Sequence, residues 1–138
     1  MSKIIYDSNM IKIMNSFGAM TRAKLKDFIT EDDKLIFIVE EGELGKAVGK
    51  KASNVKKLEN YFKKKIKIVE FHDDKLRFIQ AFIYPLRVKE IHEEEEIVVI
   101  VGPDAQTKGL LIGKNAANLR KLEDYVKRYF DVKEIKVL

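Results

Sequence analysis

The stretch GKAVGKKASNVKKLENY, residues 45–61, returns as GLLIGKNAANLRKLEDY at residues 109–125. The two stretches align without a gap at an offset of 64 residues, and nine of the 17 aligned positions are identical. Most of the other positions are conservative exchanges, such as Val48 for Ile112. Because an internal repeat of this quality settles the architecture, we expect two copies of one structural unit.

Each repeated stretch predicts two helices joined by a four-residue turn that begins with glycine. The first helix ends at Val48 or Ile112, and the turn covers residues 49–52 or 113–116. The second helix carries apolar residues at helical spacing. Glycine permits a tight turn and leaves room for the close approach of a partner. Ser53, directly after the first turn, is predicted to cap the second helix.

The flanking sequences predict one further helix and three strands in each unit. The predicted helices cover residues 8–17 and 74–82, where apolar residues recur at helical spacing. The predicted strands cover residues 24–29, 35–39 and 66–68 in the first unit, and residues 86–91, 97–101 and 135–137 in the second. The run of acids at residues 93–96 is predicted to form a hairpin turn. We therefore predict an α/β (α+β) fold with units at residues 1–72 and 73–138, each ordered helix, strand, strand, helix-turn-helix, strand.

Composition excludes several classes of protein. The 138 residues include no cysteine, so a disulfide framework, a thiolate metal site and a cysteine nucleophile are all ruled out. The apolar runs are far shorter than the roughly 20 residues that cross a bilayer, and the first residues do not resemble a signal peptide. We expect a cytoplasmic protein with no membrane partner.

The balance of charge favours an anionic partner. The net charge is +5 and the sequence pI is about 9.2, although a high content of charged residues is also typical of heat-adapted proteins. Residues 45–71 carry a net +7 and residues 108–138 a net +4, which leaves −6 for the rest of the chain. The positive charge is therefore concentrated on the helix-turn-helix segments. The cluster at residues 63–67 belongs either to this surface or to the C-terminal end of a helix, whose dipole lysine complements.

Two catalytic interpretations fail. The glycine-lysine turns are not P-loops, because that motif requires Ser or Thr after the lysine, where the chain has Lys51 and Asn115. His72 and His92 have no neighbouring cysteine or histidine with which to bind a metal. We expect no enzymatic activity, no cofactor, no metal and no small-molecule substrate.

A core of two helices between strands, with a glycine-led turn joining the helices, resembles the KH domain. The extra helix and strand before this core resemble the prokaryotic, type II arrangement, in which the sheet is three-stranded and mixed. Two such domains in tandem, covering essentially the whole chain, resemble the archaeal NusA-like transcription factors. The resemblance implies binding of single-stranded RNA and a role in transcription elongation or termination, and it makes RNA polymerase a candidate partner.

The resemblance also implies a set of RNA-binding residues in and around the two turns. In the first unit they are Val48, Gly49, Lys50, Lys51, Ala52, Asn54 and Lys56. In the second they are Ile112, Gly113, Lys114, Asn115, Ala116, Asn118 and Arg120. Bases would lie in an apolar groove, for which further candidates are Val55, Ile66, Ile68, Leu119 and Ile135. An apolar residue at any of these positions is more commonly part of the plain structural core.

The two turns depart from the family pattern at their last residue, and this departure bears on which function is expected. Both turns end in alanine, Ala52 and Ala116, where the family has a second glycine. Since this position leads into a helix, in which alanine is well tolerated, we expect an effect on affinity more than on the fold. A ribosome-associated or RNA-processing factor stays open as an alternative. So does a protein-interaction module whose nucleic-acid site has weakened.

Overall fold

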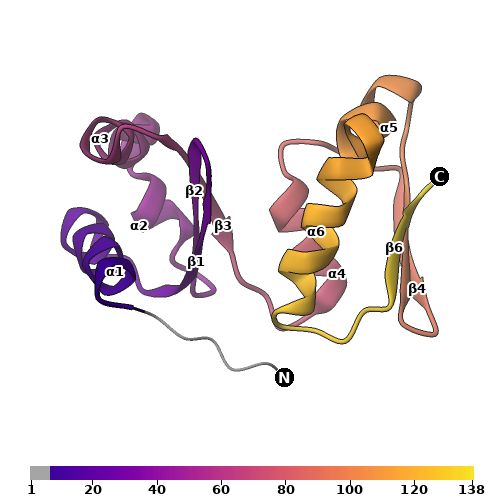
Figure 1. The fold of residues 1–138 in the computed structure, drawn as a ribbon, viewed down its shortest axis with the longest axis horizontal. Helices are drawn as coiled ribbons and strands as arrows, with labels where there is room; N and C mark the ends of the chain where they lie inside the picture. The colour runs from indigo at the N-terminus through magenta and orange to yellow at the C-terminus, as the bar shows by residue number, and fades with distance from the viewer. Residues whose placement is uncertain (1–6) are drawn as a thin grey trace. The chain divides into compact units, whose positions relative to one another are not determined.

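The computed structural model describes residues 7–138, which form two compact units, one ending at His72 and the next beginning at Asp73 (Figure 1). The first unit contains α1 (Ser8–Thr21), β1 (Leu25–Glu31), β2 (Lys34–Val39), α2 (Leu44–Val48), the 3-10 turn η1 (Lys50–Ala52), α3 (Ser53–Phe62) and β3 (Lys65–Glu70). The second contains α4 (Lys75–Ile83), β4 (Glu90–Glu94), β5 (Ile97–Val101), α5 (Ala105–Ile112), the 3-10 turn η2 (Lys114–Ala116), α6 (Ala117–Lys127) and β6 (Glu134–Val137).

The two units share one topology. Sheet A has the order β1-β2-β3 and sheet B the order β4-β5-β6. In each sheet the first pair of strands is antiparallel and the second pair is parallel. The helices of the first unit lie on one side of sheet A, and α4 and α6 lie on one side of sheet B (Figure 1). The predicted α+β fold with two three-stranded mixed sheets is confirmed.

Aspartates at helix starts fix where three helices begin. Asp7 accepts a hydrogen bond from the backbone N–H of Met10 at 2.8 Å, and Asp74 accepts one from Leu76 at 2.9 Å. Asp104 accepts a bond of 2.7 Å from Thr107. These bonds satisfy N–H groups that have no partner inside the helix.

A core of phenylalanines holds the first unit together. Phe37, at the centre of β2, is fully buried and stacks on Phe17 of α1 with ring centroids 4.3 Å apart. Phe28 of β1 and Phe62 of α3 each lie 6.0 Å from the same ring. In this way one side chain of the central strand joins α1, α3 and β1 into one packed layer.

A second aromatic cluster forms around Phe78 of α4, which is fully buried. Its ring lies 5.5 Å from Tyr129 and 5.7 Å from Phe130, both in the segment after α6. Phe82, one turn further along α4, lies 5.4 Å from Tyr125 of α6. The helix predicted at residues 74–82 therefore contributes the buried face that the spacing of its apolar residues indicates.

The strand predicted at residues 86–91 is wrong in its bounds, because β4 starts at Glu90 and includes Glu93 and Glu94. β4 lies at the edge of sheet B, so strand pairing requires only its inner side, and glutamates are tolerated at the edge. The hairpin turn is correspondingly short. Only Glu95 and Glu96 form it, and both have positive φ, at 52° and 67°.

Candidate nucleic-acid interface

The two glycine-led turns adopt the same unusual backbone conformation. Gly49 and Gly113 have φ of 79° and 74°. The last two residues of each turn are left-handed as well: φ is 53° and 59° in the first turn, and 55° and 61° in the second. Because the repeat extends to individual dihedral angles, both turns present the same backbone groups to a ligand.

Glycine is required at the start of each turn for two reasons. Its positive φ disfavours any other residue. A Cβ atom on Gly49 would also lie 2.7 Å from the Ser53 hydroxyl oxygen, and one on Gly113 would lie 2.7 Å from Cγ of Asn118. The helix that follows therefore packs directly against the glycine backbone.

Ala52 and Ala116 are not in helical conformation, which contradicts the expectation that alanine is well tolerated there. Each takes the N-cap position of the following helix with a left-handed backbone, at a cost of about 1 kcal/mol or more per residue. The second glycine of the family pattern has its physical reason at this position. The departure to alanine thus affects stability as well as the space open to a ligand.

The N-terminal ends of α3 and α6 have no side-chain cap. The N-cap residues are Ala52 and Ala116, whose side chains have no atom that could accept a hydrogen bond from the helix. Ser53, the predicted cap, is instead the first residue of α3. Uncapped N–H groups at the start of a helix can bind an anion, and the helix dipole adds to the attraction. The prediction that Ser53 caps α3 is wrong, and its failure leaves this end of the helix open.

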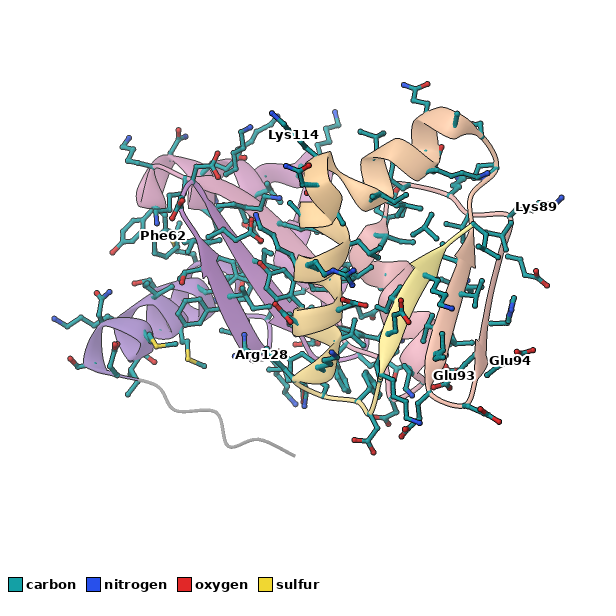
Figure 2. All side chains as sticks on the ribbon, turned by 45° about the vertical axis from the view of Figure 1, so that its right-hand side comes forward. Phe62, Lys89, Glu93, Glu94, Lys114 and Arg128 are labelled. Atoms are coloured by element: carbon teal, nitrogen blue, oxygen red, sulfur yellow. The ribbon has the colours of Figure 1, made fainter. Side chains whose placement is uncertain are left out.

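The lysine side chains of the turns are exposed to solvent. Lys50, Lys51 and Lys114 are exposed, and no ion pair is found for them within residues 7–138. Asn115 is exposed too, at the position of Lys51. Figure 2 shows Lys114 extending from the end of the second unit where α6 begins. Two exposed cations therefore flank the first uncapped helix and one flanks the second.

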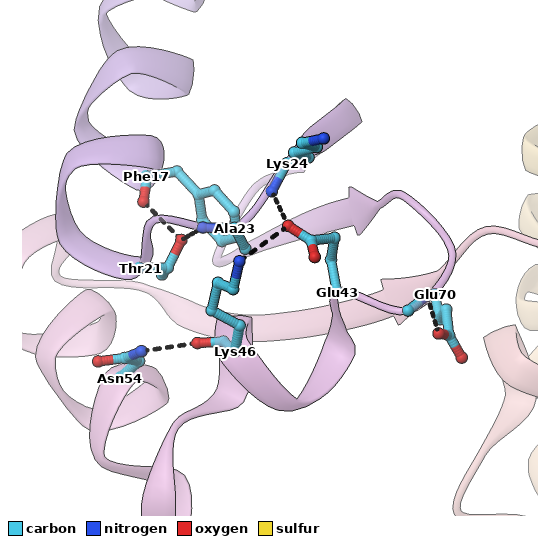
Figure 3. Close-up of polar contacts among 9 residues, drawn as sticks. Phe17, Thr21, Ala23, Lys24, Glu43, Lys46, Asn54 and Glu70 are labelled. Atoms are coloured by element: carbon cyan, nitrogen blue, oxygen red, sulfur yellow. Dashed lines mark hydrogen bonds and ion pairs between the residues drawn. The ribbon is translucent and has the colours of Figure 1, made fainter.

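Asn54 and Asn118 connect the two helices across each turn. The amide nitrogen of Asn54 donates to the carbonyl oxygen of Lys46 at 3.0 Å (Figure 3). The amide nitrogen of Asn118 donates to the carbonyl oxygen of Leu110 at the same distance. These bonds fix the angle between the helices. The structure therefore gives both asparagines a positioning role at the candidate site.

Lys56 and Arg120 occupy the same place in the repeat but differ in their contacts. Lys56 is exposed, whereas Arg120 donates a 2.8 Å hydrogen bond to Glu123, which raises the pKa of the guanidinium. Glu123 is 5% exposed, and it also accepts a 2.8 Å bond from the backbone N–H of Ile135 in β6. Arg120 is thus tied to a carboxylate that anchors the edge of sheet B.

The residues predicted to line an apolar groove differ in burial. Val48, Val55 and Ile112 are half-buried beside the turns. Ile66 and Ile68 are half-buried as well, and both pack against the core of the first unit. Leu119 is 9% exposed and Ile135 is 1% exposed, so these two belong to the core and are not available to bases. The groove prediction is wrong for Leu119 and Ile135.

Glu43 is a site residue that the sequence pattern did not indicate. Its carboxylate accepts a 2.8 Å hydrogen bond from the backbone N–H of Lys24, which lowers the pKa of the glutamate, and lies 3.6 Å from the Lys46 ammonium (Figure 3). This contact holds the five-residue α2 against the start of β1. In the second unit Asp104 instead caps the longer α5, and the hydrogen bond from the Thr107 N–H lowers the pKa of that aspartate. The bond between Lys24 and Glu43 joins residues 19 positions apart, so no local sequence motif indicates it.

Two further features of the described residues concern metals and membranes. Within residues 7–138 no group of three or more His, Asp or Glu side chains is arranged to hold a metal ion. No helix in the same range has the length and apolar character needed to cross a bilayer.

The architecture defines the class of protein: it is an α+β chain of two repeated units with mixed sheets, consistent with tandem KH-like domains. A similar fold occurs in the crystal structure of APE1850, with a TM-score of 0.74 at 24% sequence identity over 96% of this chain and 100% of that one. No family model matches the chain.

Known relatives make the assignment more specific. The chain is 30% identical over 139 residues to the probable transcription termination protein NusA of Methanococcus vannielii, covering 99% of this chain and 80% of that protein. Proteins of the same name from Methanocaldococcus jannaschii and Thermoplasma acidophilum are 27% and 26% identical. They align with 100% and 99% of this chain, and the alignments cover 77% and 97% of their own lengths. The chain belongs to the family of archaeal NusA-like transcription termination proteins.

Proposed function

We propose that the chain binds single-stranded RNA without catalysis, and that it does so in transcription elongation or termination in the cytoplasm. Residues 1–72 and 73–138 would each act as one type II KH domain. The observation that carries the proposal is the repeated turn: the same left-handed backbone, an uncapped helix start and exposed lysine occur in both units. An RNA backbone supplies the phosphates that such a site attracts.

Each turn would bind the sugar-phosphate backbone through Gly49, Lys50, Lys51 and Ala52, or through Gly113, Lys114, Asn115 and Ala116. Val48 and Ile112 would contact bases, and Lys56 would extend the positive surface. Asn54, Asn118 and Arg120 would act through the geometry of the helices. Because two sites on one chain raise the effective concentration of a bound strand, tandem binding would exceed the affinity of either unit alone.

A titration with labelled RNA tests the proposal. Fluorescence anisotropy would compare a random single-stranded pool with a matched duplex at two salt concentrations. The test variant carries Lys50→Asp, Lys51→Asp and Lys114→Asp. The control variant carries the same charge change at exposed lysines outside the turns: Lys12→Asp, Lys89→Asp and Lys127→Asp.

We expect preference for the single strand, weaker binding at high salt, and a loss of at least tenfold in the turn variant but not in the control. Loss of three phosphate contacts should also reduce the slope of log affinity against log salt by about 2. Equal loss of affinity in both variants would mean that net charge alone accounts for the loss. The turns would then be rejected as the binding site. Absence of binding at low salt would reject RNA binding altogether.

Family membership supports RNA polymerase as a protein partner. Co-sedimentation with purified archaeal RNA polymerase, run beside purified ribosomal subunits, separates this role from one on the ribosome. Binding to polymerase alone supports the transcriptional role. Binding to ribosomal subunits alone rejects it.

A further inference from the structure

Sheet B has an apolar row on the face that points away from its helices. Paired residues lie on the same side of a sheet, and the ladder places Ile97 opposite Glu94 and Glu134, and Val99 opposite His92 and Lys136. Val98 and Ile100 point to the other side and are fully buried. Ile97, Val99 and Val101, by contrast, are half-buried. We call this the open face of sheet B.

The open face is hollowed. A shallow depression of about 560 Å³ is lined by Ile97, Val99, Glu94, Glu95 and Lys136. Its floor is aliphatic and its rim is charged, the arrangement found where protein surfaces meet.

The repeat supplies a comparison for this surface. Ile36 and Ile38 of β2 occupy the places of Val99 and Val101. Ile36 and Val99 each pair with a lysine of the parallel neighbouring strand, and Ile38 and Val101 lie two residues further along the central strand. The unit therefore carries an apolar row at this position twice, and in the second unit the residues of that row are half-buried.

The charge around the open face selects the kind of partner. Glu90, Glu94 and Glu134 pair with the apolar row, and Glu95 is at the adjoining hairpin tip. The basic side chains opposite Val99 are Lys136 and His92, and His92 lies 3.6 Å from Glu90. No ion pair is found for Glu94 or Glu95 within residues 7–138. A carboxylate rim repels phosphate and attracts lysine and arginine.

The acidic rim is also separated from the candidate RNA site. Figure 2 shows Glu93 and Glu94 at one end of the second unit and Lys114 at the other. The floor of the depression is aliphatic and offers no aromatic ring on which a base could stack. The two ends of this unit thus differ in both charge and chemistry.

We propose that the open face of sheet B docks an amphipathic helix of a partner protein, with an apolar stripe flanked by lysine or arginine. The spacing fits, because alternate residues of a strand repeat at about 6.6 Å and residues four apart on a helix repeat at about 6 Å. Three apolar residues at positions i, i+4 and i+8 would follow Ile97, Val99 and Val101. The flanking cations would pair with Glu94, Glu95 and Glu134.

A designed peptide tests this surface directly. The probe is a helical peptide with leucine at i, i+4 and i+8 and lysine on both flanks, and its control has glutamate in place of each lysine. Binding to the full chain would be followed by anisotropy and by amide chemical shifts. Protein variants are Val99→Lys, the pair Glu94→Lys with Glu95→Lys, and, as a control, Asp124→Lys on the exposed side of α6. Thermal melts would show that each variant folds.

We expect saturable binding of the lysine peptide, with shifts confined to β4, β5 and β6. Val99→Lys should weaken the affinity for the lysine peptide at least tenfold, and the double variant Glu94→Lys with Glu95→Lys at least fivefold. Asp124→Lys should change this affinity less than twofold. The turn variant of the RNA experiment should bind the peptide normally, so the two proposals fail independently.

Four outcomes overturn the docking proposal. They are absence of saturable binding, equal binding of the glutamate peptide, shifts of the same amides on addition of RNA, and self-association that Val99→Lys abolishes. The last outcome, read from molar mass by light scattering, would assign the open face to a second copy of the chain.

Discussion

The side-chain amide of Asn54 donates a hydrogen bond to the backbone carbonyl of Lys46, 3.0 Å away, and thereby joins the end of α2 to the start of α3 across the glycine-led turn. Asn118 makes the same bond to Leu110 in the second unit. The turn between these helices holds three residues with positive φ, and sparsely populated backbone conformations of this kind persist only where the surrounding structure supports them. The asparagine bond supplies that support, so the shape of the candidate site depends on a residue outside the turn.

Replacing this asparagine should destabilise the fold. We expect Asn54→Ala or Asn118→Ala to lower the free energy of unfolding by about 1 kcal/mol, since a hydrogen bond to a backbone carbonyl is lost. Urea denaturation measures the change, and Asn60→Ala, at an exposed position of α3, is the matched control. Unchanged stability together with weakened RNA binding would instead give Asn54 a direct contact with RNA.

The two alanines that end the turns offer a stabilising substitution. Ala52→Gly and Ala116→Gly should each raise the free energy of unfolding by about 0.5–1 kcal/mol, because relief of the left-handed strain exceeds the added chain entropy of glycine. Ala81→Gly, within the helical α4, should lower it by a similar amount. Thermal denaturation of the three variants decides the sign. Destabilisation by all three would show that the left-handed backbone carries no cost.

The repeat and the spacing of apolar residues predicted the fold well because burial decides both. α4 and the central strand β2 bury most of their apolar residues, β5 buries Val98 and Ile100, and α1 packs an apolar face against the core around its buried Phe17. The start of β4 could not be predicted in this way, since an edge strand of sequence EIHEE has only one side to pair and no apolar alternation. An element that does not contribute a continuous buried face leaves little trace in the sequence.

The sequence indicated the two turns of the candidate site, but not the left-handed backbone of Ala52 or the contacts of Glu43 and Glu123. The glycine at position 49 indicates a special backbone, whereas Ala52 gives no sign of positive φ, and only the second glycine of the family pattern could have indicated it. Glu43 and Glu123 were missed for a different reason. Each binds a backbone N–H far away in the sequence, Lys24 or Ile135, and such pairs depend on tertiary structure alone.

The buried carboxylate of Glu123 should make stability depend on pH. Burial alone would raise its pKa, but the Ile135 N–H and the Arg120 guanidinium outweigh burial and hold the pKa below its ordinary value. A carboxylate with a lowered pKa contributes stability above its unfolded pKa, near 4.5, and this contribution disappears as the pH falls through the folded value.

We therefore expect Glu123→Gln to be less stable than the natural chain at pH 7, with the difference shrinking between about pH 5 and pH 3. Urea denaturation across this range measures it. Asp124→Asn, at the exposed neighbour, should leave the pH profile of the natural chain unchanged. A difference between Glu123→Gln and the natural chain that stays constant with pH would mean that ionisation of Glu123 does not stabilise the fold.

The two turns differ in charge at one position, and this difference predicts unequal RNA binding. Lys51 and Asn115 share the same left-handed conformation and exposure, so an exchange of side chains between them changes charge without changing the backbone. Lys51→Asn should weaken binding of single-stranded RNA by a few fold and reduce the magnitude of the salt slope by about 0.7. Asn115→Lys should change both quantities by similar amounts in the opposite direction.

Anisotropy titrations of both variants at several salt concentrations measure these effects, with Lys57→Asn as a control for charge alone, because Lys57 is an exposed residue of α3 outside the turn. If the control matches Lys51→Asn in affinity and slope, the turn has no special contact with phosphate and the attraction belongs to the helix surface as a whole. If Asn115→Lys strengthens binding while Lys51→Asn has no effect, the second unit is the stronger RNA-binding unit. Such a result would place the limiting factor of the first unit outside its turn, because the two turns share one backbone conformation and both end in alanine.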